Sequence, residues 1–233
     1  MRKKSRKAEF ASRIGKILEK EYGKEVWFPG GKQPDALDTL IGTILTQHTN
    51  DANSFPAFED LKRRFPSWEK LLAAPDSSVA KTISRAGLAN IKTKRIKQAL
   101  REIKERNGGF SLSNVAKMEK EEAKEWLRSL PGVGPKTSAI VLCFSFGMPV
   151  MPVDTHIFRV ANRLGLIKTK NVDLAHELLE AMVEPEKIPT FHVNMIRHGR
   201  QVCFARKPLC WKCVLSGICK YTQKTKKPLN VER

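Results

Sequence analysis

Leu130-Pro131-Gly132-Val133-Gly134-Pro135-Lys136-Thr137 connects two stretches that have a helical pattern. Gly132 and Gly134 allow a tight turn, and they let another molecule approach the backbone without a Cβ in the way. The amides that follow open a helix, where unpaired N–H groups and the helix dipole favour an anion. Two glycines alone occur in many connections between helices, but the whole octapeptide before an almost wholly apolar helix is more specific. The segment predicts a hairpin between helices that binds a phosphate.

The charge balance of the chain indicates a polyanionic partner. Its 233 residues include 43 Lys and Arg against 24 Asp and Glu, a formal net charge of +19. Lysines that merely solvate helix faces explain a high lysine count but not an excess of this size. Nucleic acid is the commonest such partner, because each neutralised phosphate releases counterions. The 41% hydrophobic and 29% charged residues are typical of a folded globular protein.

The apolar segments are too short for a membrane protein. The longest run, 139–153, is interrupted by glycine and prolines and falls short of the roughly 20 residues that a span needs. The basic residues 1–7 have no apolar signal-peptide core behind them. These patterns predict an intracellular protein without membrane partners, in the cytoplasm or nucleoid, or in the nucleus of a eukaryote.

Helical periodicity runs through almost the whole chain, so we expect an all-α fold. Apolar residues at helical spacing begin after Pro34 and Asp35, which form a helix start signal. The segment 147–152 contains a glycine and two prolines and cannot continue a helix. It suggests two helical lobes, a barrel-like domain over 32–146 that contains the hairpin, and a second domain formed by 1–31 and 147–233. The predicted helices cover residues 37–45, 56–65, 77–86, 91–106, 119–129, 136–146, 154–164, 172–183 and 190–202.

Four of the five cysteines form a compact cluster with the spacing C-x6-C-x2-C-x5-C. The four are Cys203, Cys210, Cys213 and Cys219. Four thiolates within so short a loop can surround one metal centre, and both zinc and a [4Fe–4S] cluster accept four cysteines. The spacing by itself leaves both metals open. Cys143 lies in an apolar helix and is expected to be a buried core thiol.

The hairpin, the cysteine cluster and the segment Val153-Asp154-Thr155-His156-Ile157-Phe158-Arg159-Val160 together resemble the endonuclease III superfamily of DNA glycosylases. The resemblance extends from about Asp35 to Tyr221. It implies a helix-hairpin-helix fold with a C-terminal loop that carries a [4Fe–4S] cluster on Cys203, Cys210, Cys213 and Cys219. The chain departs from the family pattern at Pro135, where relatives usually have a basic residue.

The resemblance also implies two catalytic residues, Lys136 and Asp154. Lys136 would attack C1′ of the damaged nucleotide and hold the sugar as a Schiff base, provided that the helix end and partial burial lower its pKa. Asp154 is expected to cap a helix, and in the family it would stabilise the positive charge on the sugar or assist proton transfer. His156 is expected to be structural or to contact a phosphate.

Further DNA-binding residues follow from the need to extrude the target nucleotide. The family pattern assigns the filling of the gap to a glutamine and an apolar residue, here Gln47 and Leu88. Their alternatives are helix-end polarity for Gln47 and core packing for Leu88. In the hairpin, the DNA-binding residues would be Gly132, Val133 and Gly134. The cysteine loop would present Arg206, Lys207 and Lys212 to the DNA backbone.

The resulting hypothesis is a monomeric base-excision repair enzyme that binds damaged double-stranded DNA. It would remove oxidised pyrimidines such as thymine glycol and cleave the strand by β-elimination. One alternative is a monofunctional mismatch glycosylase acting on T or U opposite G, although such relatives typically lack a lysine at position 136. A second is a non-enzymatic helix-hairpin-helix DNA-binding protein, and a third is a zinc-stabilised scaffold. The second leaves Lys136, Asp154 and the cysteines without a shared purpose, and the third accounts only for roughly the last 30 residues.

Overall fold

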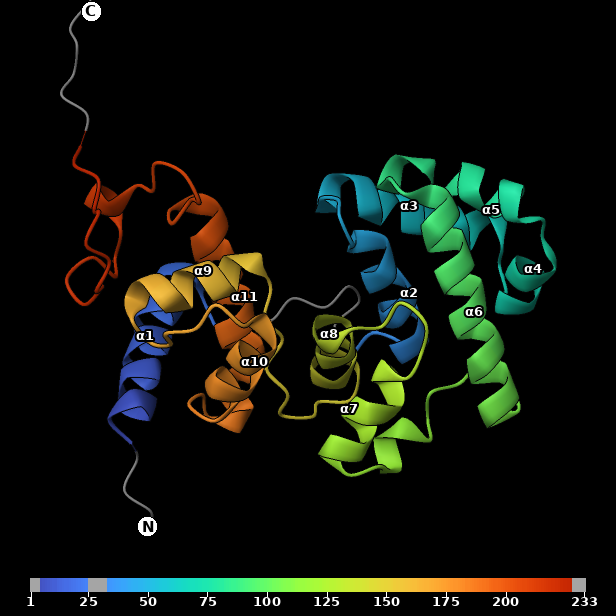
Figure 1. Cartoon of the computed structure of the whole chain (residues 1–233), viewed down its shortest axis with the longest axis horizontal. Coiled ribbons are helices and arrows are strands. Elements are labelled where there is room, and N and C mark those ends of the chain that lie inside the picture. Colours follow the sequence, from blue (N-terminus) through green and yellow to red (C-terminus); the bar gives the residue numbers. More distant parts are fainter. Residues whose placement is uncertain (1–4, 25–32, 228–233) are drawn as a thin grey trace, which may run out of the picture. The chain divides into compact units, whose positions relative to one another are not determined.

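The computed structural model describes residues 5–24 and 33–227, and over these residues the secondary structure is helical with no β-strand. The all-α prediction is therefore confirmed. The chain divides into two compact units, one formed by Phe28–Met148 and the other by Met1–Trp27 together with Pro149–Arg233. Figure 1 shows the helices of each unit coloured along the sequence.

The unit formed by Phe28–Met148 is built around two apolar helices, α2 (Ala36–Thr46) and α8 (Pro135–Ser145), which pack against each other. Asp35 caps α2 as its sequence predicts, since its carboxylate accepts hydrogen bonds from the Leu37 and Asp38 amides. Buried aliphatic side chains of α2 form the centre of the core. The other helices of this unit are α3 (Asp51–Arg64), α4 (Trp68–Ala73), α5 (Asp76–Thr82), α6 (Ala89–Asn107) and α7 (Lys120–Arg128), with 3-10 turns η2 (Ser84–Ala86) and η3 (Val115–Lys117).

The second unit combines the start and the end of the chain. Its helix α11 (Ile188–Gln201) packs against both α1 (Arg6–Tyr22) and α9 (Thr155–Leu164). The buried face of α1 comprises Ala11, Ile14 and Leu18. Helix α10 (Val172–Glu180) and two further 3-10 turns, η4 (Pro185–Lys187) and η5 (Cys210–Lys212), complete the unit before the loop that carries the four cysteines.

Two predicted helices differ from the structure, and one helix was missed. Helix α3 begins at Asp51 rather than at 56, because the Asn50 side chain caps it and Pro56 is tolerated inside it. The predicted helix 77–86 is two elements, α5 and η2, separated at Ile83. Helix α4 was not predicted, since six residues are too few to show a periodic pattern.

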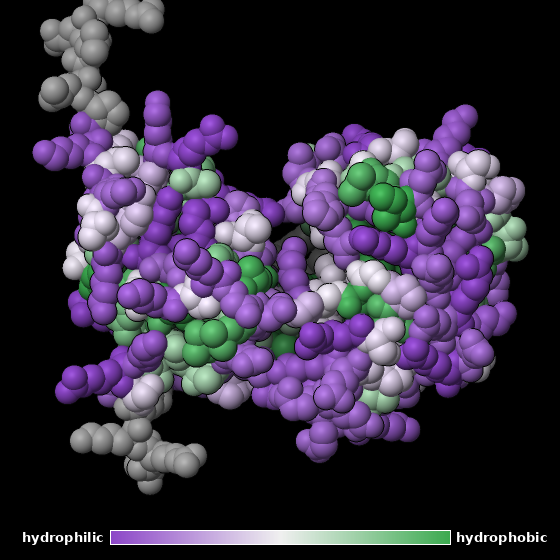
Figure 2. All heavy atoms as spheres, viewed as in Figure 1, coloured by the Kyte–Doolittle hydropathy of each residue, from purple (hydrophilic) through white to green (hydrophobic). Residues whose placement is uncertain are grey.

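The surface of both units is largely polar. In Figure 2, hydrophilic side chains cover most of the visible face of each unit, with small apolar patches between them. Among the described residues, no helix has both the length and the apolar character that crossing a bilayer requires.

Candidate active site and cluster loop

The predicted hairpin is present and joins α7 to α8. Gly132 has φ +78°, a left-handed conformation that favours glycine. The Val133 amide donates to the Leu130 carbonyl at 3.1 Å, which closes the turn. Gly134 is extended and precedes α8, and an added Cβ there would meet no protein atom within 4 Å. The hairpin thus presents an open backbone at the start of a helix, the geometry that suits an anion.

Lys136 is the second residue of α8 and follows Pro135, which occupies the first position. Proline suits this position, because its missing N–H has no partner within the helix anyway. The Lys136 side chain is exposed, whereas partial burial was expected from the sequence.

Gln47 lies against the hairpin. It ends α2, and its Nε2 donates to the Gly132 carbonyl oxygen at 2.9 Å. Its Oε1 accepts a hydrogen bond from Arg95 Nη1 of α6 at 3.0 Å. Both ends of the Gln47 amide are therefore bonded, and the residue is more than a polar helix end. Sequence reasoning missed Arg95, because the contact joins residues 48 positions apart.

Leu88 is exposed rather than packed in the core. Half of its side chain is accessible, at 50%, and its φ of 48° is left-handed. Such backbone strain in a bulky residue is found where the surrounding structure enforces it. An exposed leucine at the start of α6 is available to contact another molecule.

Lys92 connects the two segments that carry Gln47 and Leu88. It is 1% exposed, and its Nζ donates to the carbonyl oxygens of Leu45 at 2.7 Å and Ala86 at 2.8 Å. Burial, with a smaller contribution from Arg95, lowers its pKa. The burial of Lys92 was not predicted from the sequence. Lys92 lies four residues before Ile96, on the buried face of α6, but a lysine is almost never fully buried unless it is paired, so its position alone did not predict burial.

Asp154 belongs to the other unit, where it caps α9. Its Oδ1 accepts a hydrogen bond from the Ile157 amide at 2.8 Å, which confirms the predicted cap, and the residue is half-buried.

His156 joins α9 to α11. Its Nδ1 lies 3.2 Å from Arg159 Nη2, and its Cβ would lie 2.9 Å from a Cβ added to Gly199. Burial, opposed in part by Asp154, lowers the pKa of His156. The neutral ring can therefore accept a hydrogen bond from Arg159 at Nδ1. These contacts favour the structural role over the phosphate contact.

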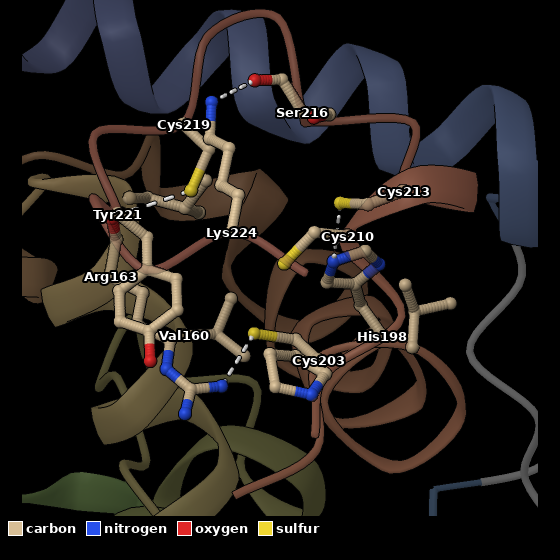
Figure 3. A pocket seen from close by; sticks show the side chains of 13 residues that line it. Val160, Arg163, His198, Cys203, Cys210, Cys213, Ser216, Cys219, Tyr221 and Lys224 are labelled. Atoms are coloured by element: carbon tan, nitrogen blue, oxygen red, sulfur yellow. Dashed lines mark hydrogen bonds between the residues drawn. The ribbon is translucent and has the colours of Figure 1, made fainter. Parts of the chain in front are cut away.

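The four clustered cysteines surround a single cavity. Cys203, Cys210, Cys213 and Cys219 all line it, together with Arg163 and Tyr221. In Figure 3 the four thiols lie around one space, with Arg163 and Tyr221 on one side and His198 on the other. Cys143 is buried in α8, as predicted.

The arrangement of the sulfurs fits a polynuclear cluster better than one zinc ion. Zinc requires every thiolate within about 2.3 Å of one point. In the described part of the chain, no three His, Cys, Asp or Glu side chains converge enough to hold one metal ion. Four thiols distributed around a cavity, with no carboxylate among its lining residues, are the donor set of a [4Fe–4S] cluster. Burial raises the pKa of Cys213 to about 11 and also raises that of Cys219, so metal binding would have to stabilise the thiolates.

Arg163 of α9 connects the cysteine loop to the helical core. Its guanidinium donates to Cys203 Sγ at 3.4 Å and to the carbonyl oxygens of Phe204 and Ala205 at 2.6 and 2.8 Å. It also lies 4.6 Å from the centre of the Tyr221 ring. One arginine thus orients the first cysteine and the chain that follows it.

His198 of α11 supports the loop from the other side. It is buried, and burial lowers its pKa to about 4, so the ring is neutral. Its Nε2 lies 3.4 Å from Cys213 Sγ and its Nδ1 lies 3.0 Å from the Tyr22 hydroxyl. A ring that donates from Nε2 to a thiolate accepts the Tyr22 proton at Nδ1, so every group is paired. The 176 residues between Tyr22 and His198 explain why sequence reasoning missed this chain of contacts.

Arg206, Lys207 and Lys212, the cations predicted to meet DNA, are exposed on the cysteine loop. Lys207 has a left-handed backbone with φ 48°.

Comparisons with known proteins agree with both regions of the site. A profile of the HhH-GPD superfamily of base excision DNA repair proteins matches residues 41–185. The iron–sulfur binding domain of endonuclease III matches residues 203–219, which include all four clustered cysteines. Endonuclease III of Thermotoga maritima is 32% identical over 190 residues, which cover 82% of this chain and 85% of that protein. Endonuclease III of Escherichia coli K12 is 34% identical over 187 residues, covering 80% and 84%.

Solved structures share the fold. A non-covalent endonuclease III–DNA complex has a TM-score of 0.78 and 24% identity, over 91% of this chain and 95% of that chain. A thermostable thymine-DNA glycosylase has a TM-score of 0.74 and 27% identity, over 92% and 96%. With a superfamily profile over well more than half of its length and full-length relatives above 30% identity, the chain is a member of the endonuclease III family of base excision repair DNA glycosylases, whose cysteine-ligated [4Fe–4S] cluster it also carries.

Proposed function

We propose that this enzyme removes oxidised pyrimidines such as thymine glycol from duplex DNA and then cleaves the strand, with Lys136 as nucleophile. The observation that carries the proposal is the exposed amine of Lys136 at the start of the helix that follows the hairpin. A phosphate bound at the hairpin would bring the adjacent sugar to this amine. The same unit presents Gln47 beside the hairpin and the exposed Leu88, which suit the filling of the gap left by an extruded nucleotide.

The reaction needs one amine and one carboxylate. The neutral Lys136 amine attacks C1′, the bond from C1′ to the base breaks, and the base leaves with the bonding electrons and takes up a proton. Loss of a proton from the nitrogen and opening of the sugar give a protonated Schiff base. Removal of a C2′ proton then expels the 3′ phosphate, and water releases Lys136. By the family resemblance, Asp154 would stabilise the positive charge that develops on the sugar or assist proton transfer to and from the amine.

The cysteine loop would dock the protein on DNA rather than take part in bond chemistry. The cluster, once bound, is expected to hold the loop's shape, while Arg206, Lys207 and Lys212 meet phosphates. We expect the protein to act as a monomer, because one extruded nucleotide needs no two-fold partner, and to work inside the cell where chromosomal DNA is.

A mismatch glycosylase is the second candidate, and the likeness to a thymine-DNA glycosylase supports it. Lys136 distinguishes the two activities, since removal of thymine opposite guanine by water requires no covalent amine. Covalent trapping therefore separates them directly.

The test uses three duplexes, one with a single thymine glycol, one with a T:G mismatch and one undamaged, each incubated with the protein and borohydride. Borohydride reduces a Schiff base, so a covalent band is expected with thymine glycol and should disappear with Lys136→Gln. Alkali-labile sites in the mismatch duplex without any covalent band would establish the mismatch activity instead. Binding without base release from either duplex would refute both.

A further inference from the structure

The hairpin has a single cation, although both phosphate binding and the proposed chemistry would use one. Between Leu130 and Thr137 the only Lys or Arg is Lys136, and the proposed chemistry uses its amine. Pro135 has neither a charge nor a backbone N–H. A phosphate at the hairpin would therefore meet backbone amides but no cation free to neutralise it. Tight binding of a phosphate usually includes Arg or Lys.

Arg95 of α6 lies against this hairpin. Its aliphatic stem packs on Gly132, since a Cβ added there would lie 2.8 Å from Arg95 Cδ and 3.1 Å from its Cβ and Cγ. Its guanidinium continues past the glycine to Gln47, to which Nη1 donates at 3.0 Å. Arg95 is half-buried. Within the described residues, Arg95 forms no ion pair with an acidic side chain.

We propose that Arg95 is the phosphate-binding cation of the hairpin, held by Gln47 in the free protein and released to the DNA backbone when Gln47 enters the duplex. The inference rests on the proposed function, because it takes the hairpin as the phosphate site and Gln47 as the residue that fills the gap. It adds a binding residue that neither the hairpin motif nor the catalytic pair contains.

The hydrogen bonds of Gln47 make the two events depend on each other. Its Nε2 is bonded to the Gly132 carbonyl and its Oε1 to Arg95, so Gln47 cannot extend into DNA without breaking both bonds. Arg95 then has a guanidinium without an acceptor, next to a backbone that binds an anion. A phosphate replaces one neutral acceptor by two charged oxygens in a geometry that matches the guanidinium fork. The contact between Arg95 and the phosphate thereby offsets the loss of the two Gln47 hydrogen bonds.

The experiment measures the salt dependence of DNA binding by the full-length protein that carries its cluster. The probe is a fluorescein-labelled duplex with one tetrahydrofuran abasic-site analogue, titrated between 50 and 200 mM salt. Each neutralised phosphate contributes about 0.9 to the slope of log K against log[salt]. Arg95→Met keeps the stem on Gly132 but removes the charge. Its slope is expected to be smaller by about 0.9, so its affinity falls about 3.5-fold less over this range than that of the native protein.

Two matched variants complete the design. Arg95→Lys keeps the charge and should retain the native slope, so a change seen only with methionine cannot come from a general loss of folding. Arg101→Met removes an exposed charge from another face of α6 and should leave the slope unchanged. A native slope for Arg95→Met would overturn the proposal, as would an equal loss with Arg95→Lys or with Arg101→Met. The readout is a binding equilibrium, so it is independent of whether Lys136 forms a Schiff base.

Discussion

Gly132 and Gly134 are two residues apart in the hairpin, yet replacing each with alanine is expected to affect a different property, stability for Gly132 and DNA binding for Gly134. Gly134 has φ −97° and ψ −177°, which any residue can adopt. An added Cβ would touch no protein atom within 4 Å. Alanine restricts the unfolded chain, which by itself would raise the free energy of unfolding by about 0.4–1 kcal/mol. Gly134 is also the N-cap of α8, where alanine is less favourable than glycine, so Gly134→Ala should leave the stability close to the native value.

Gly134→Ala should weaken DNA binding. Its methyl group would occupy the open side of the hairpin, where the phosphate is proposed to approach. Loss of one backbone hydrogen bond to a charged group is worth about 1.5–3 kcal/mol. Affinity for the abasic-analogue duplex is then expected to fall roughly 10- to 150-fold in a protein that is about as stable as the native one.

Gly132→Ala should instead damage the fold. Its φ of +78° is left-handed, and the new Cβ would lie 2.8 Å from Arg95 Cδ. The left-handed conformation alone costs about 1–2 kcal/mol for a residue with a Cβ. The melting temperature should consequently fall by about 2–8 °C, with a further decrease if Arg95 has to move.

The assay combines thermal unfolding with fluorescence anisotropy on both variants and the native protein. Gly134→Ala should show weaker binding by anisotropy but a native melting temperature. Gly132→Ala should show a lower melting temperature. Native affinity in Gly134→Ala would show that no phosphate approaches the hairpin at this residue. A native melting temperature in Gly132→Ala would refute the argument from φ and from the Arg95 contact.

Three further changes test other parts of the two units. Lys92→Met leaves two buried carbonyl groups without their donor and should lower the free energy of unfolding by at least about 2 kcal/mol, measured by urea denaturation; an unchanged midpoint would contradict the role given to this lysine. Leu88→Asn should preserve the melting temperature, because asparagine tolerates the left-handed backbone, but should reduce extrusion of 2-aminopurine; full extrusion would exclude Leu88 from that step. Burial lowers the pKa of His156 in the folded state below the ordinary 6.5, so the unfolded chain takes up the proton first, and stability should be complete above pH 6.5 and decrease as the pH falls below it. His156→Gln should lose part of this pH dependence, and identical profiles would refute the assignment.

The sequence predicted those features that depend on neighbouring residues. The apolar spacing of α2, the Asp35 and Asp154 caps and the turn at Gly132 are all local, because each is set by residues within one or two helical turns. The six-residue α4 was missed because it is too short to show a repeated helical pattern.

The residues that support the site could not be predicted, because their roles arise from contacts between distant segments. Helix α6 contains several lysines, and nothing in their residue type separates the buried ones from the exposed ones. Lys92 and Lys97 are nevertheless buried, and Lys97 forms an ion pair with Asp76. Arg95 acquires its role only when α6 packs beside the hairpin and the end of α2. Its distance of 48 positions from Gln47 leaves no periodic signal in the chain.

The packing of α1 against α11 also determines the order in which the two units can fold during synthesis. Helix α1 is made first, but the His198 partner of its Tyr22 follows 176 residues later. At about 5–20 residues per second, the ribosome needs roughly 9 to 35 s to make that interval. Throughout this time Ile14 and Leu18 lack the helix that buries them, whereas the segment 33–148 is contiguous and can fold as it emerges. During this interval the nascent chain therefore carries an amphipathic helix whose apolar face stays uncovered until α11 has been made.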